Sequence, residues 1–279
     1  MKKWKTVIEP SARLFDFKFK EIWEYRDLGF TFIRKNYITR YKQTIFAPLY
    51  MILSPLLTSG IFSVVFGTIA KISTDGIPNF LFYMTGNLIW GYFSGCMWGN
   101  NNIFEGNAYI MGKVYFPRLV IPLANTITKL IDMTVQFLMF ILFFFLFQFQ
   151  GHEFSANAWV CAIPFLLLMM AGMGFGIGLI FSSLTIKYRD FNVMLGFGMN
   201  LLMYASPIIY PTSNLEGIWR ELILINPVAG VIETFRYAFF GVGAVPIGSL
   251  IWGFALTVVL LTVGLVLFNR VEKTFIDTV

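Results

Sequence analysis

The side chains best suited to chemistry in this sequence form two small charged groups. Lys129 and Asp132 are three residues apart, a spacing that places both on one face of a helix, where they can form an ion pair. An ion pair inside an apolar helix is either a functional site or a structural contact, and its position near the start of an apolar segment favours the structural role. Glu221, Glu233 and Arg236 lie between two apolar segments, so we expect them to face protein or water rather than lipid.

Residue patterns for catalysis are absent from the chain. It has no phosphate-binding loop of the Walker type, no paired catalytic carboxylates and no nucleophile beside a base. Cys96, Cys161 and the single histidine, His152, lack the spacing of a metal site. We therefore expect a chain that is not an enzyme and holds no metal or cofactor. Because the apolar segments also lack the relay of Asp, Glu and His typical of proton-driven transporters, transport would need an ATP-hydrolysing partner.

Six long segments without a charged residue or histidine must position these groups. Hydrophobic residues make up 57% of the chain and charged residues only 13%, compared with about 25% in soluble domains. Each segment is about as long as the ~20 residues that a helix needs to cross a bilayer, or longer. The sequence therefore predicts an all-α integral membrane protein with six transmembrane helices. The predicted spans are residues 43–70, 79–103, 119–148, 158–185, 191–211 and 246–269, within a transmembrane domain of residues 43–279.

The distribution of basic residues predicts the orientation. Six spans place both termini on one side, and of the 21 lysines and arginines all but Lys71, Arg220 and Arg236 fall on that side. Since cytoplasmic segments are enriched in Lys and Arg, we expect both termini to be cytoplasmic. This topology and anionic lipid headgroups account for the net charge of +6 without nucleic acid. The basic start lacks an early apolar run, so no cleavable signal peptide is expected.

Two segments on the predicted cytoplasmic side have amphipathic character. Residues 1–42 are predicted to be either a helix lying in the membrane interface or a solvated lead-in. Apolar and aromatic residues of this segment recur on one helix face: Phe30, Ile33, Tyr37 and Tyr41. Residues 106–118 are too short and polar to span, and they predict a short amphipathic helix that projects into the cytoplasm.

Two further patterns concern the membrane region. Residues 213–243 contain two short apolar stretches separated by Asn226-Pro227, and they predict two re-entrant helices on the external side. The fourth span contains glycines at spacings that let helix backbones approach closely. These glycines are Gly172, Gly174, Gly176 and Gly178.

Several short motifs, taken in order, resemble one known family. The chain resembles the permease subunit of ABC-2 type exporters of lipid-linked polysaccharides, the group that handles O-antigen, capsule and teichoic acid, and the resemblance runs nearly end to end. The motifs are Tyr25-Arg26-Asp27-Leu28, Arg40-Tyr41-Lys42-Gln43-Thr44, Val114-Tyr115-Phe116-Pro117-Arg118, Tyr188-Arg189-Asp190, Ser206-Pro207-Ile208-Ile209-Tyr210-Pro211, Asn226-Pro227 with Glu233, Phe235-Arg236 and Gly241, and Val271-Glu272-Lys273-Thr274-Phe275-Ile276-Asp277. One departure is Phe46-Ala47, where the family has Leu-Gly, so we expect a differently shaped loop there.

The resemblance implies a homodimer with two ATPase subunits, which would hold ATP and magnesium, in the bacterial inner membrane. The helix at 106–118 would couple ATP hydrolysis to movement of the spans. The implied coupling residues are Met111, Gly112, Lys113, Val114, Tyr115, Phe116, Pro117, Arg118, Arg189 and Asp190. Arg40, Tyr41 and Lys42 would meet the diphosphate of an undecaprenyl-linked glycan. Asn226, Pro227, Glu233 and Arg236 would form a re-entrant gate.

Two other functions remain open from the sequence. The chain is alternatively an ABC-2 permease for a drug, a lipid or another small molecule, or a membrane-embedded enzyme or scaffold. Aromatic residues make up 18% of the chain, and their faces can stack on sugar rings, which favours a glycan channel. We expect charge reversal at Lys113 or truncation of Phe116 to uncouple ATP hydrolysis from transport.

Overall fold

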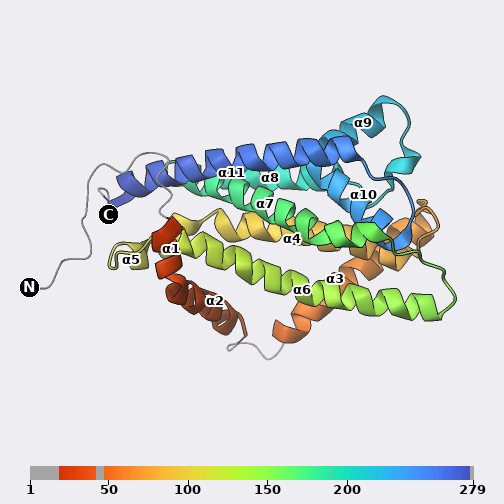
Figure 1. Cartoon of the computed structure of the whole chain (residues 1–279), viewed down its shortest axis with the longest axis horizontal. Helices are drawn as coiled ribbons and strands as arrows, with labels where there is room; N and C mark the ends of the chain where they lie inside the picture. The colour runs from red at the N-terminus through yellow and green to blue at the C-terminus, as the bar shows by residue number, and fades with distance from the viewer. Residues whose placement is uncertain (1–18, 42–46, 189, 277–279) are drawn as a thin grey trace, which may run out of the picture.

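A computed structural model describes residues 19–41, 47–188 and 190–276 of the chain (Figure 1). The described residues form helices joined by turns and loops, without a β-strand, which confirms the predicted all-α class. The longer elements are α1 (Phe19–Glu24), α2 (Arg26–Tyr41), α3 (Ala47–Phe62), α4 (Asn79–Asn100), α5 (Ile103–Met111), α6 (Val120–Phe149), α7 (Ile163–Thr185), α8 (Phe191–Tyr204), α9 (Ile218–Ile225), α10 (Pro227–Phe240) and α11 (Ile247–Ile276). Two short helical turns are η2 (Ala158–Ala162) and η3 (Thr212–Asn214), and a π-helical turn, η1 (Ser63–Ile69), continues α3.

The helices α3, α4, α6, α7, α8 and α11 lie along the long axis of the molecule, and the shorter helices gather at its two ends (Figure 1). The helices α9 and α10 lie at one end, called here the α10 end. The helices α1, α2 and α5 and the last turns of α11 lie at the other, called here the α5 end (Figure 1). The predicted cytoplasmic segments are thus collected at the α5 end.

Four helical segments are long and apolar enough to cross a membrane, or five if α9 and α10 form one span bent by 99°. The helix α4 is not among the four, although it has 22 residues. It lies at the centre of the bundle, packed against α3, α6, α7 and α10, and most of its side chains are buried. Since its neighbours shield α4 from lipid, it can carry Asn, Ser and Thr. The chain is therefore a multi-pass membrane protein, and the count of six spans stays a prediction.

The helix α8 is shorter than the predicted fifth span of residues 191–211. It ends at Tyr204, and its 14 residues rise about 21 Å, less than the ~30 Å hydrocarbon core of a bilayer. Residues 205–211 continue as a non-helical turn that contains Pro207 and Pro211. The helix ends early because a proline has no N–H for the helical ladder.

The glycines of α7 allow α4 and α11 to pack closely against it. A Cβ at Gly176 would lie 2.7 Å from the carbonyl carbon of Leu260 in α11. A Cβ at Gly174 would lie 2.6 Å from the carbonyl oxygen of Phe93 in α4. Because real Cβ atoms do not approach backbone so closely, any side chain here would push the helices apart. The prediction that these glycines permit tight helix packing is confirmed.

Candidate functional site

Arg236 of α10 is the centre of a buried polar cluster at the α10 end. The residue is 2% exposed, and its guanidinium lies 3.5 Å from the ring centroid of Phe82. It donates to the hydroxyl of Thr85 at 3.3 Å and to the carbonyl oxygens of Phe82 at 3.3 Å and Ile208 at 3.4 Å. It also donates to Glu233, one helical turn earlier, at 3.4 Å. The guanidinium thus joins α10, α4 and the turn that follows α8.

The other predicted gate residues complete this cluster. The carboxylate of Glu233 accepts from the backbone N–H of Thr212 at 3.4 Å. Asn226 caps α10 by accepting from the N–H of Val228 at 3.0 Å, and its amide donates to the hydroxyl of Ser206 at 2.8 Å. Pro227 supplies the first residue of α10, where its missing N–H costs nothing. These four residues therefore lie around one junction. Glu233 and Arg236 face protein, in agreement with the sequence expectation, while their role as a gate stays a prediction.

Glu221 is exposed on α9 in the isolated chain, so it does not join this cluster. The two helices around Asn226-Pro227 exist as predicted, but whether they dip into a membrane stays a prediction.

The predicted coupling helix at 106–118 differs from the observed helix. The helix α5 covers Ile103–Met111, so it begins three residues earlier and ends seven residues earlier than expected. Gly112 follows the last helical residue, and Pro117 cannot donate to a continued ladder. The prediction that the helix continues to residue 118 is therefore wrong. The chain from Gly112 to Pro117 is non-helical.

The proposed coupling residues divide into an exposed and a buried set. Gly112, Lys113, Val114 and Tyr115 are exposed at the α5 end, and the ammonium group of Lys113 lies 3.8 Å from the ring centroid of Tyr109. These four residues therefore form an exposed, non-helical loop in the isolated chain.

The buried set consists of Met111, Phe116 and Arg118, while Pro117 is half-buried. Phe116 packs against Phe32 of α2 with a centroid distance of 6.0 Å. Arg118 donates to the backbone carbonyl of Glu272 in α11 at 3.1 Å and forms an ion pair with its carboxylate at 3.9 Å. Burial lowers the pKa of Arg118, and the charge of Glu272 opposes that shift. These residues therefore link the end of α5 and the loop after it to α2 and α11, and their role in coupling stays a prediction.

Part of the predicted site lies outside the described residues. The side chains of Arg40 and Tyr41, and all of Lys42, Phe46 and Arg189, fall in this group, so the predicted diphosphate contact stays a prediction. Asp190 is exposed before α8.

The face of α2 differs from the predicted stripe. Ile33 and Tyr37 are half-buried, but Phe30 is 67% exposed and the buried anchor is instead Phe32. The hydroxyl of Tyr37 donates to Asp132 of α6 at 3.2 Å. Polar side chains of α2 therefore face α6, where they form hydrogen bonds.

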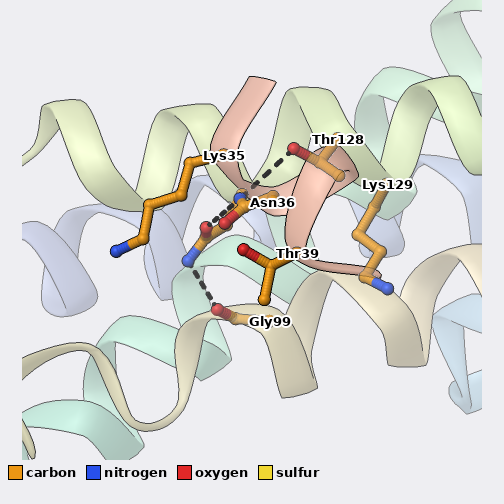
Figure 2. A pocket seen from close by; sticks show the side chains of 7 residues that line it. Lys35, Asn36, Thr39, Gly99, Thr128 and Lys129 are labelled. Carbon is orange, nitrogen blue, oxygen red and sulfur yellow. Dashed lines mark hydrogen bonds between the residues drawn. The ribbon is translucent and has the colours of Figure 1, made fainter. Parts of the chain in front are cut away.

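The predicted ion pair between Lys129 and Asp132 is confirmed, with 3.4 Å between the ammonium nitrogen and a carboxylate oxygen. Beside it lies an open pocket of about 370 Å³ that the sequence did not predict. The pocket is lined by Lys35, Asn36, Thr39, Gly99, Asn125, Thr128 and Lys129 (Figure 2). A sequence signal did exist, since polar residues recur at helical spacing in two segments: 35, 36 and 39, and 125, 128 and 129.

Comparison with known proteins places this geometry in context. Residues 28–240 match the ABC-2 type transporter family. An O-antigen export system permease protein, RfbA, from Klebsiella pneumoniae is 30% identical over 90% of this chain and 94% of its own length. The protein of the same name from Myxococcus xanthus is 23% identical over 93% of this chain and 98% of its own length.

A more limited similarity links the chain to the inner membrane transport permease YadH of Escherichia coli, 27% identical over 37% of this chain and 38% of its own length. The family match covers most of the chain, and the similarity to the RfbA proteins extends over nearly their whole length. The chain belongs to the ABC-2 type transporter family.

Proposed function

We propose that this chain is the transmembrane subunit of an ATP-driven exporter of a lipid-linked polysaccharide. The observation that carries the proposal is the similarity to proteins named O-antigen export system permeases, which spans 90% of this chain and 94% of the relative. A match confined to a common membrane region would support only a general transport function. The alternative is an ABC-2 permease for a drug, a lipid or another small molecule. The similarity to YadH, named only as an inner membrane transport permease, covers 37% of this chain and points to no such substrate.

The functional unit is a homodimer of this chain with two ATPase subunits, both termini lying in the cytoplasm. The exposed loop from Gly112 to Tyr115 is the part of the α5 end that suits docking to an ATPase. The ATPase subunits supply the ATP and magnesium sites, and this chain supplies the path for the glycan. The six spans and the re-entrant pair α9–α10 form that path in the dimer, with Glu233 and Arg236 at its α10 end.

The test is reconstitution of this chain with a co-expressed ATPase in proteoliposomes. We expect the two chains to purify together, and a lipid-linked polysaccharide to stimulate ATP hydrolysis and to move across the bilayer with ATP. The matched control is the same complex without ATP. Purification without any ATPase would contradict the subunit assignment. A complex that hydrolyses ATP but neither responds to nor moves any lipid-linked glycan would contradict the substrate.

A further inference from the structure

An aromatic and an ionic contact join α5 and the loop after it to the last turns of α11. Phe104 of α5 and Phe268 of α11 are both fully buried, and their ring centroids lie 4.7 Å apart. Arg118, in the loop after α5, donates to the carbonyl oxygen of Glu272 at 3.1 Å and pairs with its carboxylate at 3.9 Å. Phe268 and Glu272 are four residues apart, so they lie on one face of α11. The exposed loop from Gly112 to Tyr115 is therefore flanked on both sides by residues that hold α11.

The opposite end of α11 is tied to α9. Near the start of α11, the hydroxyl of Ser249 donates to the carbonyl oxygen of Leu224 at 2.7 Å. The indole N–H of Trp252 donates to the carbonyl oxygen of Ile225 at 3.0 Å. Leu224 and Ile225 are the last two residues of α9, where carbonyl groups have no partner within the helix. Side chains of α11 therefore supply the hydrogen bonds that the end of α9 needs.

Between these two ends α11 is one continuous helix. It covers Ile247–Ile276 without an internal proline, and its 30 residues rise about 45 Å along the long axis of the molecule (Figure 1). It packs closely on α7, since a Cβ at Gly264 would lie 2.7 Å from the carbonyl oxygen of Gly176. Helices rarely bend sharply without a break such as a proline, and close-packed interiors transmit strain. A displacement of one end of α11 should therefore reach the other end.

We propose that α11 is a rigid link that transmits movement of the loop from Gly112 to Tyr115 to α9, at the opposite end of the bundle. Arg118 and Glu272 are positioning residues at the α5 end of this link, and Ser249 and Trp252 are positioning residues at the α10 end. The proposal rests on the proposed function, because an ATPase must move the exposed loop. It adds the route by which that movement reaches the α10 end.

The experiment measures hydrogen exchange of residues 218–225 in the full complex with the ATPase, with and without a non-hydrolysable ATP analogue. The readout is the ratio of the two exchange rates, and it needs no glycan. We expect the analogue to change exchange in α9 of the parent complex. E272Q removes the charge that pairs with Arg118, and W252F keeps an aromatic ring but removes the donor to Ile225. Changes along a coupling route alter the coupling by about two- to thirtyfold, so each variant should reduce the effect of the analogue by about twofold or more.

The control is E24Q, which removes the same charge from an exposed side chain of α1 and should keep the parent ratio. Thermal unfolding of each variant separates the roles, because a merely structural contact lowers the melting temperature and leaves the ratio unchanged. An unchanged ratio in E272Q or in W252F, or no effect of the analogue on α9 of the parent, would overturn the proposal. If the ratios change as expected but the complex moves no lipid-linked glycan, the link is supported and only the proposed substrate is contradicted.

Discussion

Basic side chains lie at both ends of this bundle, but their surroundings differ. At the α10 end, the guanidinium of Arg236 is surrounded by four acceptors and an aromatic ring, all from the protein. At the α5 end, Lys35 is exposed and Lys129 is half-buried beside its partner Asp132, and both border an open pocket. Residues 86 and 99 of α4, which face the two sites, are separated by about 20 Å of helix rise.

The difference teaches that a buried charge needs a complete set of partners, whereas a charge open to solvent does not. A buried charge stabilises a fold only when its partners are complete, because a charge left unpaired in a low-dielectric interior is costly. Arg236 meets that condition, and so its role is to join three segments. The pocket lysines do not need to meet it, because Lys35 is exposed to solvent and Lys129 is paired with Asp132.

The largest expected effect comes from breaking the complete cluster. Arg236→Met leaves Glu233 buried without its cation, so we expect the folded protein to lose about 3–5 kcal/mol. The measurement is thermal unfolding of the detergent-purified protein together with its yield. Arg236→Met combined with Glu233→Gln removes both charges and should recover part of the loss. An R236M protein as stable as the parent would show that the cluster is not structural.

Phe116→Ala should have the next largest effect. The change removes a buried ring that packs against Phe32, and we expect a loss of about 3 kcal/mol from the resulting cavity. Loosening of α2 should accompany the loss, measured as faster hydrogen exchange in residues 26–39. The exposed neighbour Tyr115 provides a control, because Tyr115→Ala should leave the exchange of α2 unchanged. Equal exchange in the two variants would contradict the anchoring role of Phe116.

Alanine substitutions at two glycines of α4 test how closely the two ends of the bundle are packed. A Cβ at Gly86 would lie 3.0 Å from the Cα of Ile208 and 3.3 Å from a guanidinium nitrogen of Arg236, whereas a Cβ at Gly99 would lie 3.9 Å from Asn125. We expect Gly86→Ala to cost about 1–3 kcal/mol from overpacking. Gly99→Ala should be neutral or stabilising by up to about 1 kcal/mol, because alanine favours the helix. Thermal unfolding of both variants tests this order, and the reverse order would refute it.

The pocket itself offers a smaller contrast between a structural and a free polar group. Asn36→Ala removes the hydrogen bonds to Asn125 and Thr128, so we expect a loss of about 1 kcal/mol. Thr39→Val removes a hydroxyl with no partner among the described residues and should change the melting temperature little. If the two variants have the same melting temperature, the hydrogen bonds of Asn36 do not hold α2 in place.

Lys113→Glu should have the smallest effect on stability, because the side chain is exposed. We expect it to leave the complex assembled with intact ATP hydrolysis but reduced transport, since the loop would meet the ATPase with the wrong charge. Transport in proteoliposomes divided by ATP hydrolysis measures this coupling. Lys71→Glu is the control at an exposed position outside the coupling loop. Normal coupling in K113E would remove this loop from the ATPase interface.

Much of the fold was predictable because lipid imposes strong rules on sequence. Long uncharged segments, close glycines and the pair Lys129–Asp132 depend on neighbours within one helix or on the solvent, and all are found. Helix ends were less predictable. The sequence placed a helix at 106–118, but it ends at Met111 because Gly112 and Pro117 interrupt it, and Phe116, which was assigned to coupling, is buried against Phe32.

The sequence by itself determined the all-helical membrane architecture and the family, because apolar length and loop motifs are local properties of the chain. Only the tertiary structure decided which polar groups meet. Asn36 and Asn125 are 89 residues apart, and Arg236 and Thr85 are 151 residues apart. The residue pattern within one helix cannot predict such a contact, because the contact depends on how separate helices pack. Packing therefore decided that Arg236 is enclosed by its partners, whereas Lys35 stays exposed at an open pocket.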